Sequence, residues 1–218
     1  MTFSVSRTLL GMILMASCLV CAETSFTEMR KAAEQGDALA QFNLGVMYSQ
    51  GQGVTQSCVE AGRWYRKAAD QGNADAQFSL AVMYGNGLGI AQDYVESARW
   101  YRKAAAQGNT SAESNLGVMY IQGLGVTQDY AEAIRWFSKA ANQGDGLAQA
   151  KLALMFRDGE GTPRDYVRAY MWFDLAAARS TAPEQGRFAA MRDDLAGKMT
   201  PAEVGRARRL IGEWQPTK

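Results

Sequence analysis

The sequence predicts an all-α protein: a solenoid in which pairs of helices repeat along the chain and end in a C-terminal helical cap. Three observations predict this fold. Tryptophans recur at one spacing, at Trp64, Trp100, Trp136 and Trp172. Glycines recur at the same spacing, at Gly36, Gly72, Gly108 and Gly144. Each copy holds two helix-length segments, and a chain of about 40 residues or fewer rarely buries a core alone, so neighbouring copies must pack together.

The repeats divide the chain into seven expected segments. They are a signal peptide at 1–22, an N-terminal half repeat at 23–36, four repeats at 37–72, 73–108, 109–144 and 145–179, and capping helices at 180–218.

Residues 1–22 resemble a secretory signal peptide. Arg7 precedes an apolar run over 9–20, and small residues end the segment at Ala22. We expect a mature chain that begins near Glu23 and is periplasmic or secreted. Two alternatives stay open, acylation of Cys18 after export and an uncleaved anchor, so membrane attachment is expected only if the chain is lipidated or keeps its signal.

The repeat at 73–108 shows how each copy builds two helices. In the segment 75–85, Ala76, Leu80 and Tyr84 recur at helical spacing and form one apolar stripe. The slot beside Leu80 holds Ala81, and small residues at this slot allow the second helix to come close. The second segment, 94–107, carries a comparable stripe together with Trp100. We therefore expect the tryptophans in the core.

Glycine pairs connect the two helices, as in Gly87 and Gly89. A phosphate-binding loop would need a preceding strand and a third glycine at the start of a helix. The sequence instead indicates helix termination through left-handed backbone conformations. The second helix then begins at an N-cap with an acid three residues on, in the pairs Ser57 and Glu60, Asp93 and Glu96, and Asp129 and Glu132.

After the fourth copy the repeat register fails at Thr181, Ala182 and Pro183. One amphipathic helix is marked by Phe188, Met191 and Leu195, and another by Val204, Ala207, Leu210, Ile211 and Trp214. The second starts at Thr200–Pro201, with Glu203 completing a capping box. We expect Arg206, Arg208 and Arg209 on or near the opposite face. An end repeat must hide its apolar side from water, so the pair reads as a terminal cap.

These motifs carry a family resemblance. The run A-x-x-x-L-[GA]-x-x-[YF]-x-x-G-x-G, followed by D-Y-x-x-A-x-x-W-[YF]-x-x-A-A-x-Q-G, resembles the Sel1-like repeat, a relative of the tetratricopeptide repeat. The resemblance implies a right-handed α/α superhelix that scaffolds protein complexes, and it names no partner. A cysteine-rich branch of the family is linked to β-lactam binding and hydrolysis. This sequence lacks those cysteines, so that activity is not carried over.

Composition excludes several functions. Without Arg7 the 23 basic residues become 22, equal to the 22 acidic ones, so no basic surface for nucleic acid is expected. With no histidine, there is no imidazole base and no His-containing metal site. We expect no metal and no cofactor. If the signal is cleaved, Cys58 is the one cysteine left; it takes the slot of Tyr94, which favours a packed thiol.

A binding function would use the first helices. Positions beside the buried stripe align from copy to copy, and in the similar tetratricopeptide superhelix such positions line a concave groove. This groove ladder comprises Phe42, Val46, Gln50, Phe78, Val82, Asn86, Ser114, Val118, Ile121, Gln122 and Arg157. An apolar and amide lining suits an extended peptide or a partner helix. The alternative is that Val46, Val82 and Val118 fill space between stacked helices.

The sequence therefore predicts a non-catalytic scaffold or adaptor of the cell envelope that binds a protein or peptide. Two other functions stay open. One is a cell-envelope hydrolase that relies on carboxylates. The other is a regulatory or inhibitory subunit of an envelope enzyme, which would share the binding chemistry.

Overall fold

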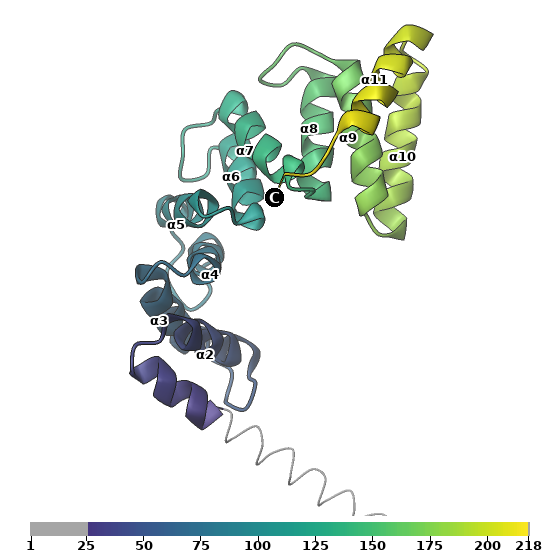
Figure 1. Cartoon of the computed structure of the whole chain (residues 1–218). Helices are drawn as coiled ribbons and strands as arrows, with labels where there is room; N and C mark the ends of the chain where they lie inside the picture. Colours follow the sequence, from purple (N-terminus) through teal and green to yellow (C-terminus); the bar gives the residue numbers. More distant parts are fainter. Residues whose placement is uncertain (1–25, 218) are drawn as a thin grey trace, which may run out of the picture. The chain divides into compact units, whose positions relative to one another are not determined.

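The computed structural model describes residues 26–217, and this part of the chain is helical without any strand. Residues 26–34 form a helix. The helices that follow are α2 (Ala38–Gln50), α3 (Cys58–Asp70), α4 (Ala74–Asn86), α5 (Tyr94–Ala106), α6 (Thr110–Gln122), α7 (Tyr130–Asn142), α8 (Gly146–Asp158), α9 (Tyr166–Arg179), α10 (Ala182–Ala196) and α11 (Pro201–Glu213) (Figure 1). The expected signal peptide, the new terminus at Glu23 and Cys18 lie outside the described residues.

The helices pack with their neighbours in sequence, so the predicted solenoid of helix pairs is confirmed. Within repeats, α2 packs on α3, α6 on α7 and α8 on α9; between repeats, α3 packs on α4 and α7 on α8. The described residues divide into two compact units, one ending at Asp93 and the other beginning at Tyr94. Each unit buries its own apolar residues between successive helices.

Small residues bring the two helices of a repeat into close contact, as predicted. A Cβ added at Gly45 would lie 2.6 Å from the Tyr65 ring, and one added at Gly117 would lie 2.7 Å from the Phe137 ring. Real Cβ atoms do not approach that closely. The aromatic ring of the second helix therefore rests directly on the backbone of the first.

The two glycines of each connecting loop have different roles. Gly87 ends α4 in the left-handed region, with φ of 69°, as predicted. The second glycine of the next loop, Gly125, has φ of 65° and lies directly against the Tyr94 carbonyl at the start of α5. The second glycine is thus also a contact between neighbouring repeats, which the sequence alone did not indicate.

Helix capping agrees with prediction in part. Ser57 and Asp129 accept hydrogen bonds from the backbone at the start of α3 and α7. The acids Glu60 and Glu132 do not close capping boxes; each pairs with an arginine three residues on, at 2.6 Å and 2.7 Å. The box predicted at Thr200 and Glu203 does close. The sequence analysis missed the caps of the first helices, at Asp37, Asn73, Asn109 and Asp145.

The tryptophans of three repeats are buried, with Trp64, Trp100 and Trp172 exposing 8%, 1% and 7% of their surface. Trp136 differs from the expectation because it is only half-buried, and the fully buried ring in that repeat is its neighbour Phe137. A lysine three residues on covers the outer ring face in three repeats. The pairs are Trp64 with Lys67 (4.1 Å), Trp100 with Lys103 (3.9 Å) and Trp136 with Lys139 (4.2 Å).

The fourth repeat is covered by the predicted cap. Helices α10 and α11 both pack on α9, and Arg192 of α10 forms an ion pair with Asp174 at 2.6 Å. The Trp214 ring lies edge-on to Trp172, with centroids 6.4 Å apart. Beyond α11 the chain returns to α7, where the Thr217 amide donates to the Asn142 carbonyl at 2.8 Å (Figure 1).

Candidate functional site

The groove ladder stays at least partly accessible in the folded chain. Among the described residues none of its members is fully buried. The half-buried members are Phe42, Val46, Phe78, Val82, Ser114, Val118, Ile121 and Arg157, and the exposed members are Gln50, Asn86 and Gln122. Because the ladder spans both units, its members are described within each unit separately.

The apolar ladder residues divide their surface between packing and solvent. Phe42 lies against Tyr65 with ring centroids 5.8 Å apart. Val118 and Ile121 pack against the core of the second unit and remain half-buried. Part of each side chain therefore fills space between helices, and part is available for contact with another molecule.

The polar ladder residues are held by local interactions. Gln50 accepts a hydrogen bond from the Gln52 amide at 2.6 Å, and the Asn86 amide donates to the Val82 carbonyl at 2.9 Å. Arg157 forms a bidentate ion pair with Asp158, with both distances 2.7 Å. Such exposed groups can exchange these bonds for bonds to a ligand at small cost.

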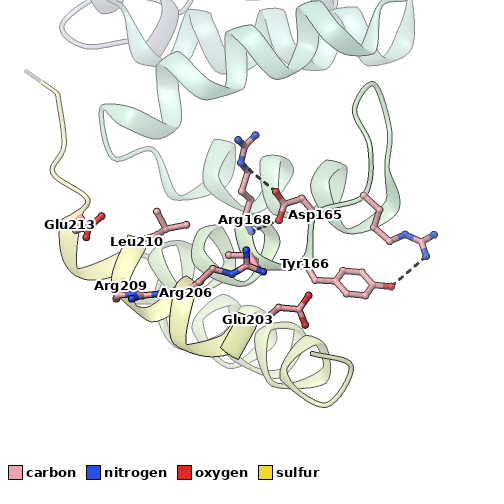
Figure 2. A pocket seen from close by; sticks show the side chains of 10 residues that line it. Asp165, Tyr166, Arg168, Glu203, Arg206, Arg209, Leu210 and Glu213 are labelled. Atoms are coloured by element: carbon pink, nitrogen blue, oxygen red, sulfur yellow. Dashed lines mark hydrogen bonds and ion pairs between the residues drawn. The ribbon is translucent and has the colours of Figure 1, made fainter. Parts of the chain in front are cut away.

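A second feature is a cleft of about 690 Å³ between the start of α9 and one face of α11 (Figure 2). The α9 side contributes Arg164, Asp165, Tyr166, Val167 and Arg168, and the α11 side contributes Glu203, Arg206, Arg209, Leu210 and Glu213. The α11 residues recur three or four positions apart, which places them along one face of the helix. We call this feature the arginine cleft.

Two carboxylates of the arginine cleft are already engaged within the chain. Asp165 accepts from the Arg168 amide at 3.0 Å and lies 3.4 Å from its guanidinium. Glu203 accepts from the Thr200 amide and hydroxyl at 2.8 Å and 2.9 Å. These bonds, together with the charge of Arg206, hold the pKa of Glu203 below its ordinary value.

The two arginines that α11 contributes to the cleft, Arg206 and Arg209, are not engaged in this way. Within residues 26–217, neither Arg206 nor Arg209 forms an ion pair or a side-chain hydrogen bond. Leu210, which lines the cleft together with these arginines, is 38% exposed. Leu210 was expected on the apolar face of this helix, and the arginines were expected on or near the opposite face. Arg206 and Arg209 are exposed, as expected, whereas Leu210 lines the cleft together with them instead of being buried.

A third feature surrounds a buried carboxylate on α6. In the other first helices this position holds a glutamine whose amide donates to a carbonyl of the preceding repeat: Gln41 to Ala33 at 3.0 Å, Gln77 to Ala69 at 3.1 Å and Gln149 to Ala141 at 3.0 Å. Glu113 takes the place of this glutamine and is 4% exposed. These residues were not predicted from the sequence, although their spacing equals that of the tryptophans.

The Glu113 carboxylate lies beside a pocket of about 450 Å³ that Lys139, Asn142 and Thr217 also line. The Gln143 amide donates to it at 2.8 Å. Burial raises the pKa of Glu113, while the charge of Lys139 and this hydrogen bond act in the opposite direction. The hydrogen bond from Gln143 joins the buried carboxylate on α6 to the end of α7 within the same repeat.

Within 26–217, no three cysteine, aspartate or glutamate side chains come together as a metal site would require. No helix in the same range has the length and apolar character to span a bilayer. Cys58 is half-buried with a free thiol at the start of α3.

Comparisons with known proteins agree with the helical architecture. The Sel1 repeat family model matches residues 29–37, 38–73, 74–109, 110–145 and 146–180. No protein of curated function matches the sequence significantly.

Two solved structures are similar to the chain. A Sel1 repeat protein from Oxalobacter formigenes is 40% identical over 74% of this chain and 67% of its own, with a TM-score of 0.71. A protective antigen present in uropathogenic Escherichia coli strains, with an SLR fold, is 31% identical over 87% of this chain, with a TM-score of 0.55. The match spans 48% of that antigen, about half its length.

Proposed function

The chain belongs to the Sel1 repeat family, and we propose that it is a non-catalytic scaffold or adaptor that binds a protein or peptide partner in the cell envelope. Repeats of this family typically mediate protein interactions. The partner would contact the groove ladder on the first helices. The envelope location rests on the signal-like segment at 1–22.

The observation that carries the proposal is the regular recurrence of accessible apolar side chains. Phe42 and Phe78 occupy equivalent places on α2 and α4, and Val46, Val82 and Val118 occupy equivalent places on α2, α4 and α6. All five are half-buried. Scattered exposed apolar residues are ordinary, but a repeated set flanked by amides offers the apolar contacts and hydrogen-bonding partners that peptide recognition uses.

A non-catalytic role is supported by how the ionisable groups are used. The acids at the helix starts cap backbone amides or pair with arginines, as Asp129 and Glu132 do on α7. The buried acid Glu113 accepts a hydrogen bond from Gln143 of the same repeat. The sequence has no histidine to act as a general base near neutral pH.

The proposal is tested by capture of partners with a double variant of α4, Phe78→Glu with Val82→Glu. Two carboxylates on the ladder should abolish recovery of the partner from envelope extracts, because an apolar contact surface does not accept unpaired charges. Helix content, measured by circular dichroism, should stay at the wild-type level because both side chains keep solvent access.

The matched control is Val95→Glu on α5. Val95 is 63% exposed and lies on a second helix, outside the ladder. This variant should recover the same partners as the wild type. If the α4 double variant is folded and still captures an unchanged set of proteins, the ladder is not the binding surface.

A further inference from the structure

We propose that the arginine cleft between α9 and α11 is a second binding site, which takes a short acidic segment of a partner protein through Arg206 and Arg209. The site shares no residue with the groove ladder. The proposal for the arginine cleft can therefore be tested independently of the function proposed above.

The charges of the cleft favour a ligand with carboxylates. Four arginines line it, Arg164, Arg168, Arg206 and Arg209, against three acids. Two of the acids, Asp165 and Glu203, are engaged by groups of the chain itself. The guanidinium groups of Arg206 and Arg209 are left to bind an added carboxylate, and the planar guanidinium matches a carboxylate with two parallel hydrogen bonds.

The length of the cleft fits a few residues of extended chain. Its α11 wall runs from Glu203 to Glu213, which at the helical rise is about 15 Å. An extended peptide covers that distance with about four or five residues. Arg206 and Arg209 lie in the middle of the wall (Figure 2).

An apolar floor lies beside the charges. Leu210 is 38% exposed, and Val167 of α9 is half-buried across from it. The equivalent valines Val59 and Val95, which no capping helix covers, are 49% and 63% exposed. An apolar side chain between two acidic residues of the ligand would cover this floor.

The distribution of charge favours a peptide over a membrane or a phosphate. Asp165, Glu203 and Glu213 lie among the arginines. A densely charged anionic surface would meet these carboxylates as well as the guanidinium groups, and like charges repel it. A peptide with separated carboxylates can contact each arginine and avoid the acids.

The test measures binding of a fluorescein-labelled peptide of alternating glutamate and leucine, about five residues long and blocked at both ends, by fluorescence anisotropy. The wild-type full chain should bind it, and added salt should weaken the binding. The double variant Arg206→Gln with Arg209→Gln should bind about tenfold more weakly, as expected for the loss of two exposed charge contacts.

The matched control is Arg208→Gln. Arg208 has the same charge and the same helix but does not line the cleft. This variant should bind within about twofold of the wild type. The double variant Arg206→Lys with Arg209→Lys keeps the charge and should show an intermediate loss, because lysine lacks the planar fork. Circular dichroism checks that every variant is folded.

Several outcomes would overturn the proposal. They are no binding of the peptide by the wild type at millimolar concentration, an equal loss in Arg208→Gln, or equal binding of a peptide with glutamine in place of glutamate. Binding of phosphatidylglycerol vesicles or inorganic phosphate that depends on Arg206 and Arg209, without binding of the peptide, would assign the cleft to another anion and would also overturn it.

Discussion

Each repeat has a tryptophan at the same position of its second helix. This side chain is covered in one way in the first three repeats and in another way in the fourth. In α3, α5 and α7 a lysine three residues on lies over the indole, as Lys103 does over Trp100. In α9 the equivalent residue is Leu175, which is 6% exposed, and the indole of Trp172 meets Trp214 from beyond α11. One helical turn before Leu175, α9 differs from the other second helices in the same way. It has the buried Met171 where α3 and α7 have arginines that form ion pairs with acids.

The difference shows how the last repeat terminates the solenoid. An internal second helix can leave its outer face to charged side chains, whose stems cover apolar surface while their charges stay in water. The last repeat instead buries that face under α10 and α11. The change from lysine to leucine is therefore the local signature of the cap, and the open edge of that cap is the arginine cleft.

The largest expected effect comes from exchanging the leucine of α9 and the lysine of α5 at their equivalent positions. Leu175→Lys places an ammonium group without a partner beneath the cap, and we expect a loss of at least about 3 kcal/mol in the free energy of unfolding. Urea unfolding followed by circular dichroism measures it. Limited proteolysis should cut first near α10 and α11.

The reverse exchange, Lys103→Leu, is the control. Lys103 is exposed, so its loss removes one cation–π contact and should change the free energy of unfolding by no more than about 1 kcal/mol. Equal effects of the two exchanges would show that the faces of α5 and α9 do not differ as described.

Removal of the aromatic residue beyond α11 should have an intermediate effect. Trp214→Ala removes the contact with Trp172 and the position of the Arg179 guanidinium over the Trp214 ring, 4.5 Å from its centroid. Because Trp214 is only half-buried, we expect a loss of about 2 kcal/mol, less than for a core aromatic residue. Gln215→Ala, at an exposed residue of the same segment, should leave the unfolding midpoint unchanged; an equal loss there would contradict the role of the indole.

The smallest expected effect on the free energy of unfolding concerns Glu113, the residue by which α6 differs from the other first helices. Glu113→Gln restores the glutamine found in the other repeats, whose amide can donate to the Ala105 carbonyl. We expect a gain of about 1 kcal/mol at about pH 7, the usual worth of one hydrogen bond. Urea unfolding at about pH 4 and about pH 7 measures it.

The gain should depend on pH in a defined direction. Burial raises the pKa of Glu113 above its value in the unfolded chain, so the folded state binds that proton more tightly. Its contribution to stability is present below the unfolded pKa and is lost as pH rises through the folded pKa. The advantage of Glu113→Gln should therefore grow from about pH 4 to about pH 7. A constant difference between variant and wild type would show that Glu113 does not titrate in this way.

The sequence predicted the repeats because their signals are local. The small residue at Gly117 and the glycine that ends α4 each act within one helix pair, and the structure confirms both. The regular spacing of Trp64 and Trp100 follows because each repeat is a copy of the same pair, and both indoles are buried. Trp136 departs from the prediction, since it is only half-buried although Phe137 beside it packs on Gly117 in the same way as Tyr65 packs on Gly45 beside the buried Trp64.

The arginine cleft could not be predicted, because it depends on how the cap docks. Arg164 and Arg168 are far in sequence from Arg206 and Arg209, and the repeat register stops before α10. A helical pattern predicts an apolar face, but it does not predict that Ala207 is fully buried while Leu210 is 38% exposed. The ladder residues were named from the register, and their role as a binding surface stays a prediction.

The most direct test of the account is site-specific photo-crosslinking in the intact cell envelope, with a photoreactive amino acid in place of Val82 on α4 or Val95 on α5. The account predicts that position 82 gives one defined crosslinked protein, that the Phe78→Glu change removes it, and that position 95 does not give it. The same products from both positions, or no protein product from position 82, would contradict the account.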